Sequence, residues 1–422
     1  MIIEFNVTNF RSFLENQTFS LVKNKSAELP MNSFHTIYKD LDLLKSSVIY
    51  GANASGKSNL LKSLLTMKKI VVESSQHGSE LPVTPFKLDR TSLKQPSEFE
   101  VTFIVENVRY QYGFSSTEER IFQEWLFAYP KGRAQKWFER IWDMENEKYQ
   151  WQFSNLLTGT KQVWQNATRE NALFLSTAVQ LNSEQLKPVF DWFKNTLRFG
   201  AVGGFNPDYS ASLCINDAKN NKSTEILNFL KAADLNINGI HVEEEEFSPN
   251  SLPTDMPEPI KNIIVEKLNG EKLLSVQTIH KTHDGDLVSF DLEDESDGTQ
   301  KLFAFAGPWI DVLKNGYVLF IDELHDNLHP KLVQYLVELF HNEKTNPKNA
   351  QLIFTTHETS ILNQDIFRRD QVWFCERNFN QATKVYPLSD FSPKKGKENL
   401  EAAYLSGKYG ALPFVHSFTM EK

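Results

Sequence analysis

A glycine-bounded loop early in the chain has the residue types that bind a phosphate chain. Residues 51–60 read GANASGKSNL, which has the form G-x-x-x-x-G-K-S. Gly51 and Gly56 allow the loop to wrap a phosphate chain with its backbone N–H groups pointing inward. In this pattern Lys57 reaches the β- and γ-phosphates, and the Ser58 hydroxyl binds Mg²⁺. We therefore predict a site for ATP and Mg²⁺, whose further nucleotide-binding residues are Asn53, Ser55 and Asn59.

A second pair of residues that could take part in chemistry directly follows the apolar run YVLFI: Asp322 and Glu323. Such a run is typical of a strand buried on both faces in a parallel sheet. Ligands bind at the carboxyl ends of such strands. Asp322 is therefore placed to hold the Mg²⁺ that Ser58 also binds, and Glu323 is the candidate base that polarises the attacking water. The alternative is that the Asp–Glu pair is a simple helix N-cap.

The pentapeptide SDGTQ precedes this acidic pair by a single predicted helix, from Lys301 to about Asn315. Its serine and glycine open that helix, whose N-terminus offers an anion site for the γ-phosphate of ATP held by a second subunit. Alone, the pentapeptide could be an N-cap and nothing more. The predicted nucleotide contacts here are Ser296, Asp297, Gly298, Thr299 and Gln300.

Apolar patterning indicates the elements that must position these residues. The run SSVIY (46–50) predicts a strand before the glycine-bounded loop, and leucines at helical spacing from Leu60 predict a helix after it. The alternative is that residues 51–58 form a flexible surface turn with a solvated lysine, but this would explain neither the strand before the loop nor the helix after it. Residues 1–23 predict strands, and residues 98–114 alternate like an antiparallel pair.

Three regions follow from these patterns: an N-terminal half of an ATPase core (1–118), a mixed α/β insertion (119–285) and a C-terminal half of the core (286–422). The insertion contains aromatic-rich segments with a hairpin-like pattern and two stretches with helical spacing, SEQLKPVFDWFKNTL (183–197) and STEILNFLKAA (223–233). Its acidic run, Glu243–Glu246, favours a solvated strand or loop edge.

Composition bounds the class of protein. At 422 residues the chain exceeds the usual size of a single core, so two or more domains are expected. The net charge of −9 argues against a nucleic-acid protein that depends on an overall positive field. The two cysteines lack metal-ligand spacing and fit a reducing compartment. The N-terminus MIIEFNVTNF does not resemble a signal peptide, and no apolar run reaches membrane-spanning length, so we expect a cytoplasmic protein.

The order of the motifs resembles that of ABC-type ATPases, and SDGTQ resembles their signature motif. In that comparison LHDNLHP (324–330) lies where the D-loop does. His357, at the end of QLIFTTHE, matches the switch histidine that contacts the γ-phosphate and the water, although a lone histidine after a strand is more often structural. NFRSF (9–13) extends the resemblance to RecF/Rad50/SMC-like members, in which such a segment helps hold the nucleotide; this implies a role for Arg11.

The resemblance implies an α/β fold, namely an ABC-type (RecF/Rad50-like) P-loop ATPase head with a mixed α/β insertion between P-loop and signature motif. More narrowly, ESDGTQKLF, FTTHETSILN, RRDQVWF and YLSGKYGALPFV resemble the RloA-like bacterial ATPases of phage-defence and abortive-infection operons. Their relatives include the ATPase subunits of PARIS and AbiL systems and the ATPase half of OLD nucleases. The resemblance covers residues 1–114 and 286–422.

Several features depart from these families. Nothing in the chain sustains the heptads of the long SMC and Rad50 coils. The Q-loop region, Pro85–Asp89, offers no glutamine. The stretch after FCER is shorter than the roughly hundred residues that a TOPRIM nuclease domain needs. His325 and His329 lie four apart beside acidic residues, so a metal site is an alternative there, although Mg²⁺ prefers oxygen ligands to imidazole.

These observations predict a switch ATPase that dimerises, or forms a higher homo-oligomer, around ATP, with Glu323 and His357 as catalytic residues. The RloA-like resemblance implies an anti-phage role in which the ATPase controls a separate toxic effector, such as a TOPRIM-type nuclease encoded nearby. The alternatives are a RecF-like DNA-repair ATPase acting on DNA and a non-hydrolysing, ATP-bound scaffold. Four tryptophans of the insertion are either core residues or anchors for a protein partner: Trp125, Trp137, Trp142 and Trp151.

Overall fold

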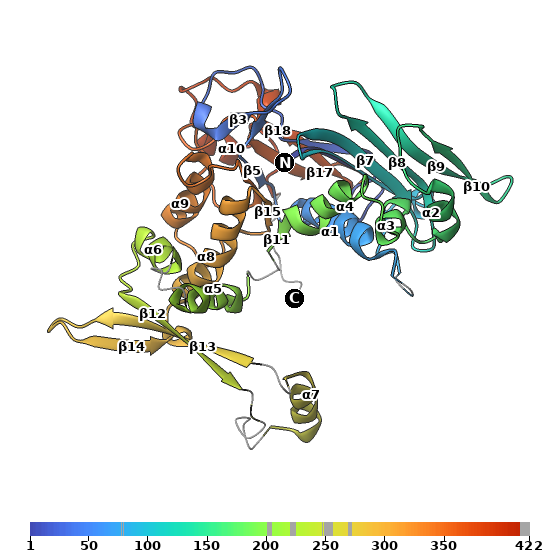
Figure 1. The fold of residues 1–422 in the computed structure, drawn as a ribbon. Coiled ribbons are helices and arrows are strands. Elements are labelled where there is room, and N and C mark those ends of the chain that lie inside the picture. Colours follow the sequence, from blue (N-terminus) through green and yellow to red (C-terminus); the bar gives the residue numbers. More distant parts are fainter. Residues whose placement is uncertain are drawn as a thin grey trace, which may run out of the picture. The chain divides into compact units, whose positions relative to one another are not determined.

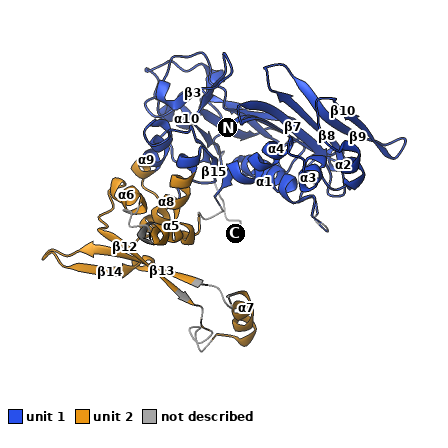
Figure 2. Ribbon diagram, viewed as in Figure 1, with its two compact units in different colours: residues 1–200, 312–326, 333–422 blue, residues 201–311, 327–332 orange. Residues whose placement is uncertain are grey.

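The computed structural model describes residues 1–76, 78, 80–200, 205–219, 225–246, 248, 256–268 and 272–413. The chain folds into two compact units (Figure 1, Figure 2). Unit 1 contains residues 1–200, 312–326 and 333–422, and unit 2 contains residues 201–311 and 327–332. Within the described part of the chain, no helix is long and apolar enough to cross a membrane.

A six-stranded sheet in unit 1 carries the P-loop. Its strands lie in the order β11-β15-β16-β5-β17-β18; the first five run parallel, and β18 pairs antiparallel with β17. β5, β15 and β16 are buried along their whole length, as the apolar runs predict. The strands are β5 (Ser46–Tyr50), β11 (Leu197–Phe199), β15 (Val318–Ile321), β16 (Gln351–Thr355), β17 (Val372–Arg377) and β18 (Thr383–Pro387).

A seven-stranded antiparallel sheet forms the rest of the unit 1 framework, in the order β10-β9-β8-β7-β6-β1-β2. β6 and β7 are the antiparallel pair that alternation predicted, and β1 pairs with both β2 and β6. A two-stranded sheet, β3 (Ser33–His35) and β4 (Asp42–Leu44), accompanies it. The seven strands are β1 (Ile2–Thr8), β2 (Gln17–Ser20), β6 (Ser97–Val105), β7 (Val108–Ser116), β8 (Ile121–Tyr129), β9 (Gln135–Asp143) and β10 (Lys148–Phe153).

Helix α1 (Lys57–Glu73) joins the two sheets into one core. Its apolar face, which includes Leu60, Leu64 and Met67, belongs to the same buried cluster as Ile49 of β5 and Phe99 of β6. Helices α3 and α4 lie beside α1 under the seven-stranded sheet (Figure 1). The further helices of this unit are α2 (Lys161–Ala167), α3 (Phe174–Gln180), α4 (Lys187–Asp191), α9 (Pro330–His341, whose first turn belongs to unit 2) and α10 (Leu400–Leu405).

Unit 2 is built on a three-stranded antiparallel sheet in the order β12-β13-β14. The acidic run Glu243–Glu246 lies in β12, and Glu243 and Glu244 are exposed, as expected for a solvated strand. Helix α5 packs against β12 and β13. The elements are α5 (Pro207–Lys219), α6 (Glu225–Ala232), β12 (Gly239–Glu246), α7 (Glu258–Leu268), β13 (Lys272–Lys281), β14 (Leu287–Asp291) and α8 (Asp297–Asn315), whose last turn belongs to unit 1.

The compact units divide the chain differently from the expected insertion at 119–285. β8 pairs with β7 along its length, so the aromatic-rich residues 121–129 form a further strand of the sheet that begins with β1. Residues up to 200 therefore belong to the P-loop unit, and unit 2 begins at residue 201. Pairing with strands outside the segment, of β8 with β7 and of β11 with β15, keeps these residues in unit 1, and alternation within one segment does not reveal it.

Two details of the region differ from the sequence interpretation. The helical stretch 183–197 yields only the short α4, a π-helical turn over Trp192–Thr196, and then β11, because Leu197 pairs with Val318 at the sheet edge. Trp125 and Trp137 are buried, with 8% and 6% of their surface exposed, so both serve the core rather than a free surface. Trp142 and Trp151 are partly buried.

Candidate nucleotide-binding site

The P-loop connects β5 to α1 and has no room for side chains at its two glycines. A Cβ on Gly51 would lie 2.3 Å from the Cys375 carbonyl oxygen. A Cβ on Gly56, whose φ is 112°, would lie 2.1 Å from the Thr383 hydroxyl. The loop is therefore pressed against β17 and β18, and only glycine permits this approach.

Lys57 begins α1 and points back over the loop. Its Nζ donates to the carbonyl oxygens of Gly51 (3.0 Å) and Ala52 (3.2 Å) and lies 3.0 Å from Nε2 of His357. Burial lowers the pKa of the Lys57 ammonium, while the carboxylate of Glu323 opposes that shift. The lysine and the histidine, far apart in the chain, thus meet at the loop.

The rest of the loop fits a phosphate chain. The first N–H groups of α1 have no intrahelical acceptor and carry the positive end of the helix dipole. The Ser55 hydroxyl is buried and has no hydrogen-bond partner among the described residues. Ser58 is half-buried in the first turn, and Asn53 is exposed. An orphaned hydroxyl beside free N–H donors is the donor set that anionic oxygens would satisfy.

Asp322 and Glu323 directly follow β15, and Thr355, the last residue of β16, forms a hydrogen bond with each of them. The Thr355 hydroxyl donates to Oδ1 of Asp322 at 2.6 Å and accepts from the backbone N–H of Glu323 at 2.8 Å. Glu323 has a φ of 54°, in the left-handed region that non-glycine residues rarely adopt. The backbone turn directs the two carboxylates differently, which matches separate roles for them.

The Glu323 carboxylate lies between two imidazoles. Its Oε1 is 3.5 Å from Nε2 of His357, and its Oε2 is 3.5 Å from Nδ1 of His325. Burial acts to raise the pKa of Glu323, but His357, Lys57 and His325 outweigh it and hold that pKa below its usual value. Burial lowers the pKa of His325. Glu323 is therefore a carboxylate at neutral pH, able to accept a hydrogen bond from water.

A metal site built on His325 and His329 finds no support. His329 belongs to unit 2, and its Nδ1 accepts from the backbone N–H of Lys331 at 3.2 Å. Across the described ranges, no group of three or more His, Cys, Asp or Glu side chains is gathered to hold an ion. A Mg²⁺ bound with ATP needs fewer protein ligands, because phosphates and waters supply the others.

The pentapeptide SDGTQ opens α8 in unit 2. Ser296 Oγ accepts from the backbone N–H of Thr299 at 3.3 Å, and the Gln300 amide donates to the carbonyl oxygens of Glu293 and Glu295. Asp297 is the first residue of the helix. A Cβ on Gly298 would lie 3.1 Å from the Asn327 carbonyl oxygen, so the pentapeptide packs closely on the residues after the acidic pair.

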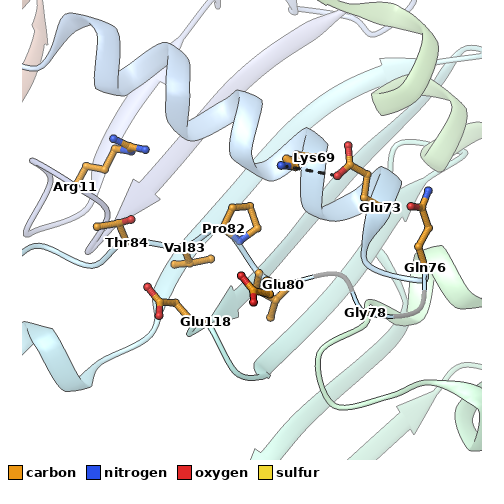
Figure 3. A pocket seen from close by; sticks show the side chains of 11 residues that line it. Arg11, Lys69, Glu73, Gln76, Gly78, Glu80, Pro82, Val83, Thr84 and Glu118 are labelled. Carbon is orange, nitrogen blue, oxygen red and sulfur yellow. Dashed lines mark ion pairs between the residues drawn. The ribbon is translucent and has the colours of Figure 1, made fainter. Parts of the chain in front are cut away.

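Arg11 lies away from the P-loop's own hydrogen bonds. It is exposed, has a φ of 51°, and its guanidinium lies 5.5 Å from the Phe10 ring. It lines a polar cavity of about 900 Å³, together with Lys69 and Glu73 of α1 and Thr84 (Figure 3). This geometry supports an indirect link between Arg11 and the nucleotide, through the segment NFRSF that carries Arg11.

The sequence analysis did not identify two residues with hydroxyl groups beside the P-loop, Ser12 and Thr383. Ser12 Oγ accepts from the Asn59 amide at 2.9 Å. The Thr383 hydroxyl donates to the Ser55 carbonyl oxygen at 2.7 Å and lies 2.9 Å from Ser12 Oγ. Ser12 stands inside the quoted NFRSF, but nothing near Thr383 in the sequence marks it, since its partners are over 300 residues away.

Residues 46–363 match the model of a family described as "AAA domain, putative AbiEii toxin, Type IV TA system". The chain belongs to this family. The match covers the P-loop, the acidic pair and His357, and members of the family are P-loop-class ATPases. The fold around the P-loop is α/β, with a mainly parallel sheet followed by helix α1. A search of curated proteins gives no match.

Among solved structures, similar chains include "SMC head domain from Thermotoga maritima", at 12% identity and a TM-score of 0.39, covering 92% of this chain and 98% of that one. The SmcHead in complex with the C-winged helix domain of ScpA is 12% identical, with a TM-score of 0.35 and coverage of 92% and 97%. The "recombination mediator protein RecF-ATPrS in RecFOR pathway" is 15% identical, with a TM-score of 0.31 and coverage of 91% and 98%.

Proposed function

We propose that the chain is an ATP-binding and Mg²⁺-dependent ATP-hydrolysing switch that dimerises around ATP. The observation that supports this most is the convergence of Lys57, Glu323 and His357, which follow the neighbouring strands β5, β15 and β16 of one sheet. Such a constellation has the parts that phosphoryl transfer needs: a phosphate cradle, a metal ligand and a group that orients water.

Each residue then has a separate task. Lys57 exchanges its carbonyl partners for the β- and γ-phosphates, while the P-loop N–H groups and Ser55 hold the remaining oxygens. Ser58 and Asp322 would hold a Mg²⁺, which neutralises charge on the phosphates. Glu323 accepts a hydrogen bond from the attacking water and orients it. His357 lies between Lys57 and Glu323 and positions both relative to the terminal phosphate.

The dimer part of the proposal assigns SDGTQ to a second copy's nucleotide. Ser296, Gly298 and the N-terminus of α8 form a helix start of the type that accepts anions. ATP would then lie between the P-loop of one copy and the pentapeptide of the other. Hydrolysis would remove that bridging anion and release the pair.

For the biological role, we propose control of a separate toxic effector in anti-phage defence. The family description, with its mention of a toxin and a toxin–antitoxin system, supports such a setting. The neighbouring gene's product is the candidate effector. Co-expression of both proteins should protect cells from phage, and Lys57→Ala and Glu323→Gln should each remove protection. Protection by this chain alone, or DNA-damage sensitivity in uninfected cells lacking it, would instead indicate a repair role.

Binding itself is tested by titration calorimetry of the full chain with MgATP. Lys57→Ala removes the charge on the phosphates and should abolish measurable binding. Lys69→Ala, a control on the exposed part of the same helix, should bind like the wild type. Equal ATP affinity in Lys57→Ala and wild type would contradict the site assignment.

A further inference from the structure

A hairpin rises beside the P-loop at the carboxyl edge of the parallel sheet. β17 pairs with β5 up to Phe374↔Tyr50 and continues to Arg377, past the end of β5. β18 returns from Thr383, which pairs with Arg377. The hairpin turn, residues 378–381, therefore lies on the side of the sheet where α/β proteins bind their ligands.

This turn is held to the P-loop at its base. The Thr383 hydroxyl donates to the Ser55 carbonyl oxygen, and its side chain fills the space beside Gly56. The turn is ordered by its own bonds: the Asn378 N–H donates to the Ala382 carbonyl oxygen, and the Ala382 N–H donates to Oδ1 of Asn378. Hairpin and loop thus form one connected surface.

A phenylalanine stands at the tip of this turn. Phe379 is 101% exposed, and no large hydrophobic side chain in the described part of the chain is more exposed. By contrast, Phe374 in β17 and Tyr409 are buried and stack on each other. Phe379 lies two residues past Arg377, which pairs with Thr383, so its Cα is within about 7 Å of the Arg377 Cα, a separation that a ribose and base can span.

The sheet order sets the direction of a nucleotide across the loop. Lys57 meets His357, at the end of β16, so the terminal phosphate belongs on the β15–β16 side of β5. The remainder of the nucleotide then extends toward the opposite neighbours of β5, namely β17 and β18. Phe379, in the turn between β17 and β18, presents a fully exposed aromatic ring on that side.

We propose that Phe379 stacks on the nucleobase and anchors that end of the nucleotide. This inference rests on the proposed ATP site and adds its base-binding residue. Stacking on an aromatic ring tolerates any base, because every base has a π face. Phe379 therefore contributes affinity for nucleotides in general rather than selection of adenine.

The test compares ATP with inorganic tripolyphosphate, which has the phosphates and lacks the base. Both are titrated, with Mg²⁺, into the full chain. Phe379→Ala should weaken ATP binding about tenfold, the scale of one stacked base, and leave tripolyphosphate binding unchanged. Phe379→Trp should retain or strengthen ATP binding. Met144→Ala, a control at another exposed apolar residue of unit 1, should change neither.

The outcomes separate this inference from the proposed function. If wild type binds neither compound, the ATP site itself is refuted. If wild type binds both and Phe379→Ala has wild-type ATP affinity, the stacking role is wrong while the site stands. An equal loss for ATP and tripolyphosphate also overturns stacking, because it shows that Phe379 supports the phosphate cradle instead.

Discussion

The two flanks of β5 differ in chemistry. On the β15–β16 flank, the site is lined by groups that carry or exchange charge: Asp322, Glu323 and His357. On the β17–β18 flank, the contacts to the P-loop come from the neutral hydroxyl of Thr383 and a carbonyl oxygen of Cys375. The comparison suggests a division of labour in which one flank does chemistry and the other holds the ligand. Mutations should therefore affect turnover on one flank and affinity on the other.

The largest expected effect is on the charged flank. Glu323→Gln keeps the shape of the side chain but loses its ability to accept a proton, so turnover should fall by about 10²-fold or more while ATP still binds. ATP-bound dimers should accumulate and be visible by size exclusion with light scattering. Normal turnover in this variant would remove Glu323 from catalysis.

A smaller effect is expected at the residue that positions the acidic pair. Thr355→Val removes the hydrogen bonds to Asp322 and to the Glu323 backbone. Turnover should fall about tenfold, since a hydrogen bond to a charged carboxylate contributes ~1.5 kcal/mol, and ATP affinity should change less. Thr355→Ser keeps the hydroxyl and serves as the control. Loss of affinity without loss of kcat would contradict the division between flanks.

On the holding flank, Thr383→Val removes the hydroxyl that donates to the Ser55 carbonyl oxygen. ATP affinity should fall about fivefold, the scale of one neutral hydrogen bond, while kcat at saturating ATP stays near wild type. Titration calorimetry and steady-state kinetics on this variant and on Thr383→Ser check it. A lower kcat with unchanged affinity would place Thr383 in the chemistry.

The smallest expected difference between the two flanks is in their dependence on pH. Burial favours protonation of Glu323, but the neighbouring His357, Lys57 and His325 hold its pKa below the usual value. The side-chain carboxyl of Glu323 in the ligand-free chain, followed by NMR, should therefore titrate below about 4.3, the ordinary glutamate pKa. The affinity ratio of Thr383→Val to wild type should stay constant over this range, since a hydroxyl does not titrate there. A Glu323 carboxyl resonance that titrates above pH 5 would count against a depressed Glu323 pKa.

The sequence predicted the parts of the site that follow continuous apolar runs. Lys57, Asp322 and His357 each come shortly after a buried strand, and parallel strands bring their carboxyl ends together. Thr383 could not be found this way, because its importance lies in contacts with Ser55 and Ser12 that only packing creates. The direct role expected for Arg11 stays a prediction, since its side chain lines the polar cavity beside α1.

For the fold, too, the sequence predicted patterns within one segment but not the pairing between segments. Alternation gave β6 and β7 but not their continuation into β8, because strand pairing is a relation between segments. The sequence left Trp125 as either a core residue or a partner anchor for a related reason: its burial depends on another segment, and its indole N–H donates to Glu100, on the strand two places away in the sheet. Residue type indicates how apolar a segment is, whereas the partner segment decides which face is covered.

The position of β5 between β16 and β17 has a consequence for how the protein is made. The P-loop strand is complete once residue 50 leaves the ribosome, yet both of its sheet neighbours begin after residue 350. Until then β5 has two unpaired edges, the kind of surface that recruits wrong partners. The seven-stranded sheet, complete by residue 153, can form much earlier. Nucleotide affinity is thus acquired only late in translation, and a nascent chain truncated before β16 has a P-loop sequence without a P-loop site.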